Sequence, residues 1–411
     1  MTLYKHTFIY TMLSVEGVVM RILALGGSGA MGRQALTTLS RIANPEIIVV
    51  ADRNRESAEA AAAELQASGQ AAAAIELDVT DDERLREVLD GFDVVMNSVG
   101  PFFRFGVPIL KAAIATGTRY YDICDDPEPT LDMLKLDAEA KEMGVTAIIG
   151  AGASPGFMNM LGVLATTGLE DIEDITSAWS FNSSYQDWDL LRSFNGQSQA
   201  ALEHFFEQIT GTVTVLVDGG YVQEPALVPF PVDIAGLGTG VGYIVGHPEP
   251  VTFRDSFHLR GNCRSLCLVT SDRAAEFSIL KERIESGALS VAQAVQLLVA
   301  RDETVAAEAA ARSASYPGGG DLPIYFVAAT GTRDGERVTQ FAATRTKPEP
   351  MAIGTGVPFA VTVATTMNSE LPAGVYPPER ILETEPFFTL VAEHWNVERG
   401  ELLYEGSAVL A

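Results

Sequence analysis

The sequence predicts an α/β protein in which a doubly wound parallel sheet is followed by an α+β domain with a mainly antiparallel sheet. Short apolar runs alternate with helical patterns between residues 21 and 150, as they do where helices connect parallel strands. A glycine-rich turn follows the first of these runs. Beyond residue 150 the alternation ends, and strand-like runs are joined by hairpin turns, which is typical of an antiparallel sheet.

The first domain, residues 21–150, is expected to contain parallel strands, each a short apolar run. We expect these strands at Arg21–Leu25, Glu46–Asp52, Ala73–Leu77, Asp93–Asn97, Arg119–Ile123 and Val145–Ile149. Apolar residues three or four positions apart indicate the intervening helices, at Met31–Ser40, Arg55–Ala67, Asp81–Leu89, Val107–Thr116 and Pro129–Met143. Such crossover helices cover both faces of a parallel sheet.

The turn after the first strand has the pattern Gly-x-Gly-x-x-Gly. In this pattern Gly27 allows a tight turn, Gly29 allows the backbone to approach a pyrophosphate, and Gly32 allows the helix to pack close to the strand. The N–H groups at the start of the helix then face the phosphates. The sequence therefore predicts a Rossmann domain that binds NAD or NADP, with phosphate contacts from Gly27, Ser28, Gly29, Ala30, Met31 and Gly32.

The choice between the two cofactors depends on the end of the second strand. Asp52 follows the turn by about twenty residues, the spacing of a carboxylate that binds the adenosine ribose. Its charge repels a 2′-phosphate and favours NAD. Arg53 comes next in the chain, and a guanidinium there can hold that phosphate, so NADP stays open.

Further cofactor contacts are expected after the third and fourth strands, because ligands of open α/β sheets bind at the carboxyl ends of the strands. The residues expected there are Asp78 and Val79 beside the adenine, and Asn97, Ser98, Gly100 and Pro101 near the ribose or the carboxamide. A solvated strand end is an equal alternative for Asp78 and Val79. Phe102 and Phe103 can wall the nicotinamide, and we expect one of the two rings to belong to the core.

The second domain is expected to span residues 151–355. Ser154 has the features of an N-cap, with Pro155 in the first turn of the following helix. The other expected elements are strands at Ile175–Asn182, Val213–Val217 and Ile324–Thr330, hairpin turns at Asp218–Gly220 and Asp334–Gly335, and helices at Asp272–Glu285 and Val291–Arg312. Residues 356–411 are expected to be helical and to return to the first domain, and residues 1–20 to form an N-terminal extension.

Composition limits the partners of the chain. It has 411 residues and a formal net charge of −26, which argues against nucleic acid and anionic membranes. No apolar run reaches the roughly 18 residues that span a bilayer. The cysteines do not suggest a disulfide framework, which favours a reducing cytoplasm. Cys263 and Cys267 lack the neighbouring ligands of a zinc site, so we expect buried thiols and no metal.

Four stretches together resemble the saccharopine dehydrogenase-like family, above all its saccharopine reductase and lysine 6-dehydrogenase branch. They are Gly26–Gly32, the Gly-Pro-Phe to Tyr-x-Asp segment within Asn97–Asp122, Gly150–Leu161 and Gly374–Glu379. The resemblance implies a Rossmann domain, a domain for catalysis and dimerisation, and C-terminal helices that return to the first domain. It also implies a homodimer that oxidises an amine, or reduces an imine, on an amino-acid-like small molecule with a nicotinamide cofactor.

Two alternatives stay open. The Gly-Pro-Phe to Tyr-x-Asp segment also resembles an enoyl-reductase-like branch of the superfamily, which implies reduction of an activated C=C or C=O bond on a larger apolar substrate. That branch usually carries Thr and Tyr in its glycine loop, whereas the loop here reads Gly-Gly-Ser-Gly-Ala-Met-Gly. The other alternative is a nucleotide-binding protein without catalysis.

An amine dehydrogenase needs a group that exchanges a proton with nitrogen and a carboxylate that stabilises the iminium cation. Asp122 and Asp126 leave the fifth strand at the cofactor edge and are our candidates, with a loop-fixing hydrogen bond as the alternative for Asp122. An arginine would bind a substrate carboxylate. Arg104 is placed for this task, with Arg254, Arg260 and Arg264 as alternatives. His247 and His258 are further acid–base candidates, although a histidine near a turn is more often structural.

Overall fold

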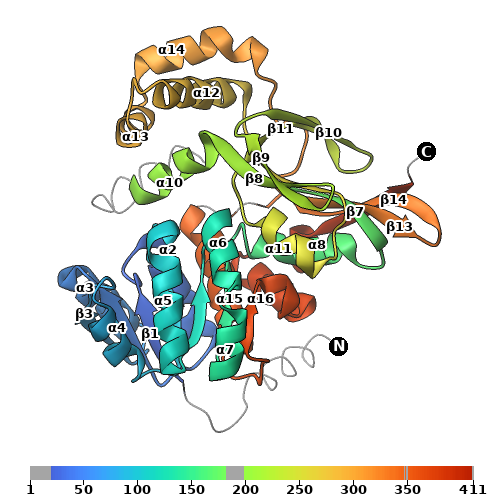
Figure 1. Cartoon of the computed structure of the whole chain (residues 1–411). Helices are drawn as coiled ribbons and strands as arrows, with labels where there is room; N and C mark the ends of the chain where they lie inside the picture. The colour runs from blue at the N-terminus through green and yellow to red at the C-terminus, as the bar shows by residue number, and fades with distance from the viewer. Residues whose placement is uncertain (1–19, 182–198, 347, 349, 410–411) are drawn as a thin grey trace.

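The computed structural model describes residues 20–181, 199–346, 348 and 350–409. The predicted extension over residues 1–19, and Asn182 at the end of a predicted strand, lie outside the described residues. The strands of the described residues form two sheets. Figure 1 shows the strands of the first sheet at the lower left and β7, β13 and β14 of the second at the right. The predicted fold class is confirmed.

The first sheet is parallel throughout, in the order β15-β6-β5-β4-β1-β2-β3. Its strands are β1 (Arg21–Leu25), β2 (Ile47–Asp52), β3 (Ala72–Glu76), β4 (Val94–Asn97), β5 (Arg119–Asp122), β6 (Thr146–Ile148) and β15 (Gly374–Tyr376). Strands β2 and β3 lie on one side of β1, and the chain then crosses to the other side of β1 to form β4, β5 and β6. The carboxyl ends of β1 and β4 therefore form the topological switch point, where such sheets bind ligands.

Helices cover both faces of this sheet, because side chains alternate along each strand. Ile22 and Ala24 of β1 pack with α2 (Ala30–Ile42), α3 (Arg55–Ala67) and α15 (Met351–Thr366). Leu23 and Leu25 belong to the core on the opposite face. The helices there are α4 (Asp82–Leu89), α5 (Phe102–Thr116), α6 (Pro127–Leu134) and α7 (Asp137–Met143). Helix α5 begins earlier than its predicted start at Val107.

Two helices predicted as continuous are each broken in two. The helix expected at Pro129–Met143 is α6 and α7, separated by a tight turn in which the N–H of Leu136 bonds to the carbonyl of Met133. The helix expected at Val291–Arg312 is α13 (Val291–Ala300) and α14 (Glu303–Arg312). Arg301 has a φ of 55°, and the side chain of Asp302 caps the start of α14. Apolar residues continue across the first break and resume soon after the second, at Val305 and Ala306, which hid both breaks in the sequence pattern.

The second sheet follows the order β10-β11-β12-β7-β13-β14-β16, and β8 pairs with both β12 and β9. Its strands are β7 (Glu170–Ser180), β8 (Thr212–Val217), β9 (Gly220–Pro225), β10 (Pro229–Ile234), β11 (Gly238–Val245), β12 (Asn262–Leu268), β13 (Tyr325–Arg333), β14 (Glu336–Thr344) and β16 (Tyr404–Val409). Its neighbours are antiparallel except β7 and β12. Both predicted hairpin turns are confirmed: Asp218, Gly219, Asp334 and Gly335 all have positive φ, as a type I′ turn requires.

The helices around the second sheet form two groups. Helices α8 (Phe157–Thr166) and α16 (Thr384–His394) share one core with the sheet, in which the Phe157 and Trp395 rings lie 4.8 Å apart. Helices α10 (Gln199–Ile209), α12 (Ser271–Glu285), α13 and α14 share another core with β11 and β12. Helix α11 (Glu249–Ser256) contacts α6 of the first domain. Figure 1 shows α10 above the first domain and α11 beside α6.

The tail, predicted to be helical from Gly356, is only partly so. Helix α15 begins at Met351 and packs on α2, where a Cβ at position 356 would lie 2.8 Å from Cβ of Gln34. After it, β15 extends the first sheet beside β6, and β16 extends the second sheet beside β14. A strand as short as β15 gives too little alternation to be recognised in a sequence.

The prediction of buried thiols is confirmed, because Cys124, Cys263 and Cys267 are all buried. Within the described chain, none of the helices combines the length and the apolar character that crossing a membrane requires.

Candidate active site

The loop between β1 and α2 has the geometry that a cofactor phosphate needs. A Cβ at Gly32 would lie 2.7 Å from the carbonyl oxygen of Gly26 and from Cα of Gly27, so the helix packs directly on the loop. Gly29 is the N-cap of α2, and a Cβ there would meet the Gly26 oxygen at 3.3 Å. Among the described side chains, none caps this helix start. Its N–H groups thus suit an anion.

Asp52 ends β2 directly beside this loop. The hydroxyl of Ser28 donates to its Oδ2 at 2.5 Å, and the N–H of Asn54 donates to its Oδ1 at 2.9 Å. These bonds fix the carboxylate at the position where the first domain would meet a ribose. The Arg53 side chain is exposed.

Replacing Asp52 by serine is expected to shift cofactor preference towards NADP by about tenfold or more. The carboxylate that repels a 2′-phosphate is lost, while Arg53 remains to bind it. The measurement is the ratio of the Kd values for NADP and NAD. D90S makes the same charge change at an exposed position between α4 and β4, at the opposite edge of the sheet, and should leave the ratio unchanged. An unaltered ratio in D52S would mean that Asp52 does not face the ribose.

Asp78 and Arg104 lie close together near the carboxyl end of β3. Asp78 accepts the N–H of Thr80 at 2.9 Å and its hydroxyl at 2.7 Å. These bonds lower the pKa of Asp78, and the charges of Arg53 and Arg104 lower it further. The Arg104 guanidinium stacks 4.9 Å from the centroid of the Phe105 ring. Arg104, predicted to bind a substrate carboxylate, is therefore near the nucleotide side of the domain. Val79 is half-buried.

The end of β4 divides into buried and exposed residues. Asn97 is fully buried, and its amide donates to the hydroxyl of Tyr120 and accepts the N–H of Val99. These bonds hold β4 in the first domain, and full burial does not favour the predicted ribose contact. The Ser98 hydroxyl donates to the backbone at Leu25, tying β4 to β1.

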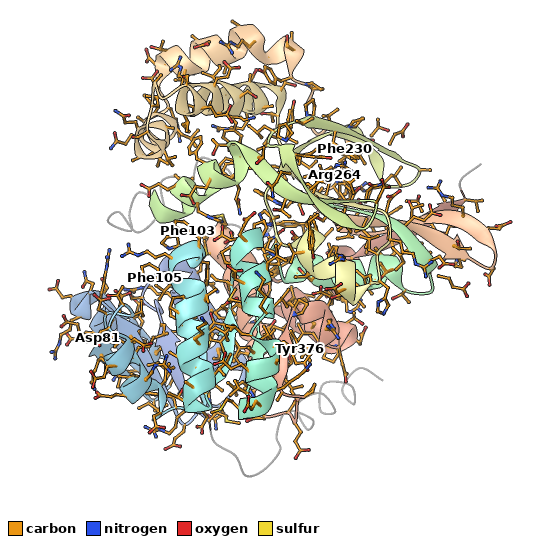
Figure 2. The ribbon with its side chains drawn as sticks, in the orientation of Figure 1. Asp81, Phe103, Phe105, Phe230, Arg264 and Tyr376 are labelled. Atoms are coloured by element: carbon orange, nitrogen blue, oxygen red, sulfur yellow. The ribbon has the colours of Figure 1, made fainter. Side chains whose placement is uncertain are left out.

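Gly100 and Pro101 form the turn that leads from β4 into α5, as predicted, and Pro101 is the N-cap of that helix. Of the two aromatic residues that follow, Phe102 is in the core, as expected for one of them. The other, Phe103, is 57% exposed. Figure 2 shows it at the end of α5 that faces the second domain, so it is the ring placed to contact a bound molecule.

Asp122, one of the two predicted acid–base carboxylates, is buried inside the first domain. Its Oδ2 accepts the hydroxyl of Tyr120 at 2.8 Å, and its Oδ1 accepts the N–H groups of Cys124 and Gly150 at 3.0 and 2.7 Å. Burial raises its pKa to about 6. These bonds connect the end of β5 to the loop after β6. The loop-fixing alternative therefore fits Asp122 better than a catalytic role.

Replacing Asp122 by alanine is expected to reduce the free energy of unfolding by about 3 kcal/mol or more, because three buried donors lose their acceptor. Urea denaturation measures this change. D132A removes an exposed carboxylate from α6 that pairs with Lys135, and it should cost less than about 1 kcal/mol. If the two variants are equally stable, Asp122 does not hold these loops together.

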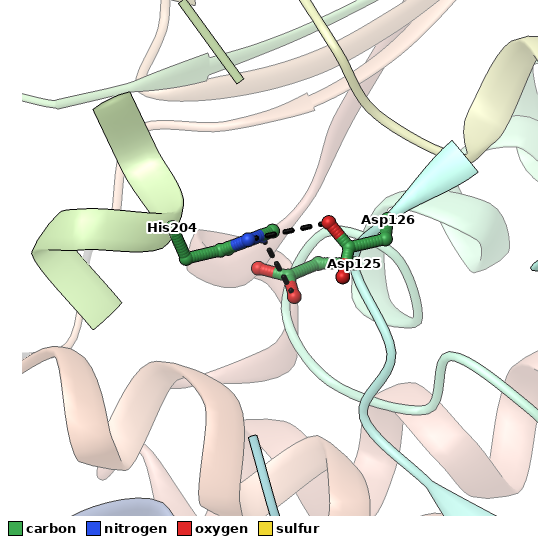
Figure 3. A group of neighbouring side chains, drawn as sticks. All are labelled: Asp125, Asp126 and His204. Atoms are coloured by element: carbon green, nitrogen blue, oxygen red, sulfur yellow. Dashed lines mark ion pairs between the residues drawn. The ribbon is translucent and has the colours of Figure 1, made fainter. Parts of the chain in front are cut away.

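Asp126, the other predicted carboxylate, meets a histidine from the second domain. Asp125 and Asp126 lie in the loop between β5 and α6, and His204 lies on α10. The Nε2 atom of His204 is 3.2 Å from Oδ1 of Asp125, and its Nδ1 atom is 3.2 Å from Oδ1 of Asp126 (Figure 3). The amide of Gln208, one turn along α10, donates to the backbone carbonyl of Asp125 at 3.1 Å. We call Asp125, Asp126 and His204 the His204 group.

The pKa values of the three side chains in the His204 group are shifted differently. Burial alone would lower the pKa of His204, but the facing carboxylates raise it well above its usual value. Burial would raise the pKa of Asp125, but the His204 charge outweighs this effect and lowers it. Burial raises the pKa of Asp126 to about 7. Asp125 and His204 thus form an ion pair, and Asp126 is left to exchange a proton near neutral pH.

The His204 group also consists of residue types that bind metal ions, with their ligand atoms within 4.8 Å of one another. The two carboxylates, however, face different nitrogens of the ring. One metal ion binds one nitrogen of an imidazole, so this arrangement favours an imidazolium ion pair over a metal site.

Ser154 and His247 meet where the two domains join. The N-cap prediction for Ser154 is wrong: α8 begins at Phe157 after Gly156, whose N–H is bonded by the side chain of Asn159. The Ser154 hydroxyl instead donates to the buried carboxylate of Glu249 at 2.5 Å, which is a charge-assisted hydrogen bond. Its oxygen lies 3.2 Å from Nδ1 of His247, a predicted acid–base residue.

The arginines considered for a substrate carboxylate have partners inside the second domain. Arg254 bonds the backbone at Gly219 and stacks on Tyr221, Arg260 pairs with Asp171, and Arg264 pairs with Glu224 and stacks on Phe230, as Figure 2 shows for the last pair. These contacts do not favour the predicted clamp. His258 is exposed in a turn with a φ of 52°.

Two site residues were not predicted from the sequence. His204 carries a weak signal, because His204, Glu207 and Gln208 are polar at helical spacing on a helix whose other described residues are mostly buried. Glu249 gave no signal beyond its place in the first turn of α11.

Comparison with known proteins gives a match to a family model and matches to individual proteins. A family model of the saccharopine dehydrogenase NADP-binding domain matches residues 22–148. A saccharopine dehydrogenase-like oxidoreductase from Rattus norvegicus is 37% identical over 90 residues, which are 22% of this chain and 21% of that protein. A putative trans-acting enoyl reductase from Mycobacterium tuberculosis is 28% identical over 106 residues, which are 26% of this chain and 25% of that protein. The matched segments thus span about a fifth to a quarter of these relatives.

Among solved structures, an apo saccharopine dehydrogenase (L-Glu forming) from Saccharomyces cerevisiae aligns with a TM-score of 0.58 and 17% identity. The alignment covers 95% of this chain and 100% of that chain, so the two share a fold over nearly their full lengths.

Proposed function

We propose that this chain, whose residues 22–148 match a family model of the saccharopine dehydrogenase NADP-binding domain, is an oxidoreductase acting at a carbon that bears nitrogen. In this proposal a hydride passes between the nicotinamide and that carbon of a small amine or imine. Bound at the β1–α2 loop, NAD or NADP supplies the hydride acceptor or donor.

The observation that carries this proposal is the state of Asp126. Its side chain is largely buried, yet its Oδ2 has no hydrogen-bond partner among the described residues. A buried carboxylate oxygen without a donor is costly, and the N–H of a substrate amine would satisfy it. Asp126 also follows β5 at the carboxyl edge of the first sheet, the edge at which a nicotinamide binds.

The residues of the His204 group then have separate tasks. Ionised Asp126 accepts a proton from the substrate ammonium, which frees the nitrogen lone pair that hydride loss requires. The negative charges of Asp125 and Asp126 stabilise the iminium cation that follows. Protonated His204 pairs with Asp125 and holds the two carboxylates close together despite their repulsion.

A second candidate is the reduction of an activated C=C or C=O bond on an apolar substrate. An aromatic cluster favours it: Trp179 lies 5.3 Å from the ring of His247 and 6.4 Å from Phe205, the neighbour of His204 on α10. Such rings could line the path of an apolar chain. The similarity to the mycobacterial enoyl reductase, which extends over 106 residues, also supports this candidate.

A turnover screen that follows nicotinamide absorbance distinguishes these proposals. It offers NAD and NADP with amines, amino acids including lysine and saccharopine, and polyamines, and in reverse with carbonyl compounds plus ammonia or amines. Enoyl thioesters form the second panel. Turnover of an amine supports the proposal, and turnover of enoyl thioesters alone supports the second candidate. Cofactor binding without turnover in either panel points to a non-catalytic protein. Light scattering on the same samples tests the homodimer, for which we expect twice the mass of one chain.

A further inference from the structure

The Tyr-x-Asp segment of β5 contains a buried hydroxyl that the mechanism above does not use. Tyr120 and Asp122 are two positions apart on the strand, so their side chains lie on the same face of the sheet. Asn97 of β4 lies in register with Asp122 on the neighbouring strand. All three side chains are fully buried. Three polar groups thus meet at the carboxyl ends of two adjacent strands, inside the first domain.

The Tyr120 hydroxyl joins these side chains into one line of hydrogen bonds. It accepts the amide N–H of Asn97 at 2.9 Å and donates to Oδ2 of Asp122 at 2.8 Å. Burial raises the pKa of Tyr120 well above its usual value, so the hydroxyl keeps the hydrogen that it donates. Both bonds donate towards the Asp122 carboxylate, and hydrogen bonds arranged in this way polarise and strengthen one another.

The two ends of this line hold separate loops at the carboxyl edge of the first sheet. At one end, Oδ1 of Asn97 accepts the N–H of Val99 at 3.0 Å, in the turn that follows β4. At the other end, Oδ1 of Asp122 accepts the N–H of Cys124 at 3.0 Å, at the start of the loop that carries Asp126. The tyrosine hydroxyl is therefore the middle link between the turn expected to contact the cofactor and the loop of the proposed base.

The next residue, Tyr121, is a natural comparison within the same strand. It is also fully buried, but its side chain packs in the core on the opposite face of the sheet. Its hydroxyl lies 3.0 Å from the hydroxyl of Thr366 on α15. The Tyr121 hydroxyl thus connects the strand to a covering helix, whereas the Tyr120 hydroxyl connects two loops of the candidate site.

We propose that Tyr120 is a positioning residue that keeps the turn after β4 and the loop carrying Asp126 at a fixed separation. The inference rests on the proposed function, in which one substrate gives a hydride to the nicotinamide and a proton to Asp126. Both transfers therefore need the nicotinamide and the carboxylate to be placed relative to each other within about 0.5 Å. In this role Tyr120 contacts neither substrate nor cofactor, and it exchanges no proton.

The kinetic test compares Y120F with Y121F in the full chain, with a substrate amine. Each variant removes one buried hydroxyl and keeps the ring, so the two should lose similar amounts of stability. Y120F is expected to lower kcat about 10- to 100-fold with the KM of the amine changed less than about threefold, because alignment and not binding is impaired. Y121F should keep kcat within about twofold of the wild type. Equal kcat values in the two variants would overturn the proposal.

Two further variants test the line of hydrogen bonds itself. In D126N the base is already lost, so adding Y120F should lower kcat by less than about threefold more. A merely structural role for Tyr120 predicts the same loss in both backgrounds, and that result would contradict the proposal. N97A covers the case in which Y120F does not fold. It cuts the line at its other end and leaves Tyr120 in place, so kcat should again fall about 10-fold or more, and an unchanged kcat would count against the proposal.

A second measurement needs no turnover. Hydrogen exchange followed by mass spectrometry reports the backbone amides of Val99 and Cys124, which lie at the two ends of the line. In Y120F both amides should exchange at least about tenfold faster than in the wild type, and in Y121F neither should. No change at these amides, or an equal acceleration along the whole chain, would overturn the positioning role. If no amine is turned over, the proposed function fails, and hydrogen exchange still decides whether Tyr120 joins the two loops.

Discussion

Replacing Asp126 by asparagine is expected to lower kcat for amine oxidation by about 10² to 10⁴-fold, the usual contribution of a general base. Asparagine keeps the size of the side chain but cannot accept the ammonium proton. The Kd of the cofactor should change little, because Asp126 follows β5 and lies outside the β1–α2 loop. Steady-state kinetics and cofactor titration measure the two quantities.

The pH profile makes this prediction more specific. Burial raises the pKa of Asp126 to about 7, and the base acts only when ionised. The value of kcat/KM for oxidation should therefore rise about tenfold per pH unit below pH 7 and level off above it, and imine reduction should show the opposite slope. Because Asp126 titrates together with His204, the observed midpoint belongs to the pair.

D132N is the control for Asp126. Asp132 is an exposed carboxylate on the neighbouring α6, and kcat and the pH profile should both stay as in the wild type. A D126N variant that retains more than a tenth of kcat, or that keeps the step near pH 7, would rule out Asp126 as the base. Turnover would then require another acceptor in the His204 group.

The second large effect is expected in the glycine loop. A side chain at position 32 would enter the van der Waals space of Gly26 and Gly27 and also approach the Ser98 hydroxyl at 2.9 Å. G32V is therefore expected to lower the free energy of unfolding by about 1–3 kcal/mol, because the loop can no longer pack against α2. For the same reason we expect the variant not to bind the cofactor. Urea denaturation and cofactor titration measure both effects.

A milder variant separates packing from phosphate binding. In G29A the added Cβ meets one backbone oxygen at 3.3 Å, which a small shift relieves. We expect a nearly normal free energy of unfolding but a Kd for the cofactor at least about tenfold higher. G91A is the control, since a Cβ there would make an ordinary contact of 3.5 Å with the carbonyl of Val88. Equal Kd values for G29A and G91A would contradict phosphate binding at this loop.

The first domain could be predicted from the sequence because its signals are local. The glycine turn, the apolar strands and Asp52 lie within one βαβ unit, where spacing along the chain determines spacing in the fold. Prediction was weaker where a turn interrupts a helical pattern, as at Leu136 and Arg301. There the break depends on backbone geometry and on a cap, not on hydrophobic period.

The site was harder to predict, because its chemistry depends on contacts far apart in sequence. Asp122 and Asp126 carry the same local signal, yet the first is bonded to Gly150 and the second faces His204 on another domain. Ser154 follows the rules for an N-cap, but Glu249, which lies 95 positions later, takes its hydroxyl. A local pattern cannot report which distant group will compete for a side chain.

The strands supplied by the tail have a consequence for synthesis on the ribosome. Both β15 and β16 come from the last part of the sequence, yet each lies at the edge of a sheet whose other strands emerge much earlier. Until residue 376 has left the exit tunnel, the nascent nucleotide-binding sheet exposes the open edge of β6, which can pair with other chains. A fragment ending at residue 150 would keep that open edge permanently. Transplanting this cofactor module into another gene would therefore require the segment from α15 through β15 as well.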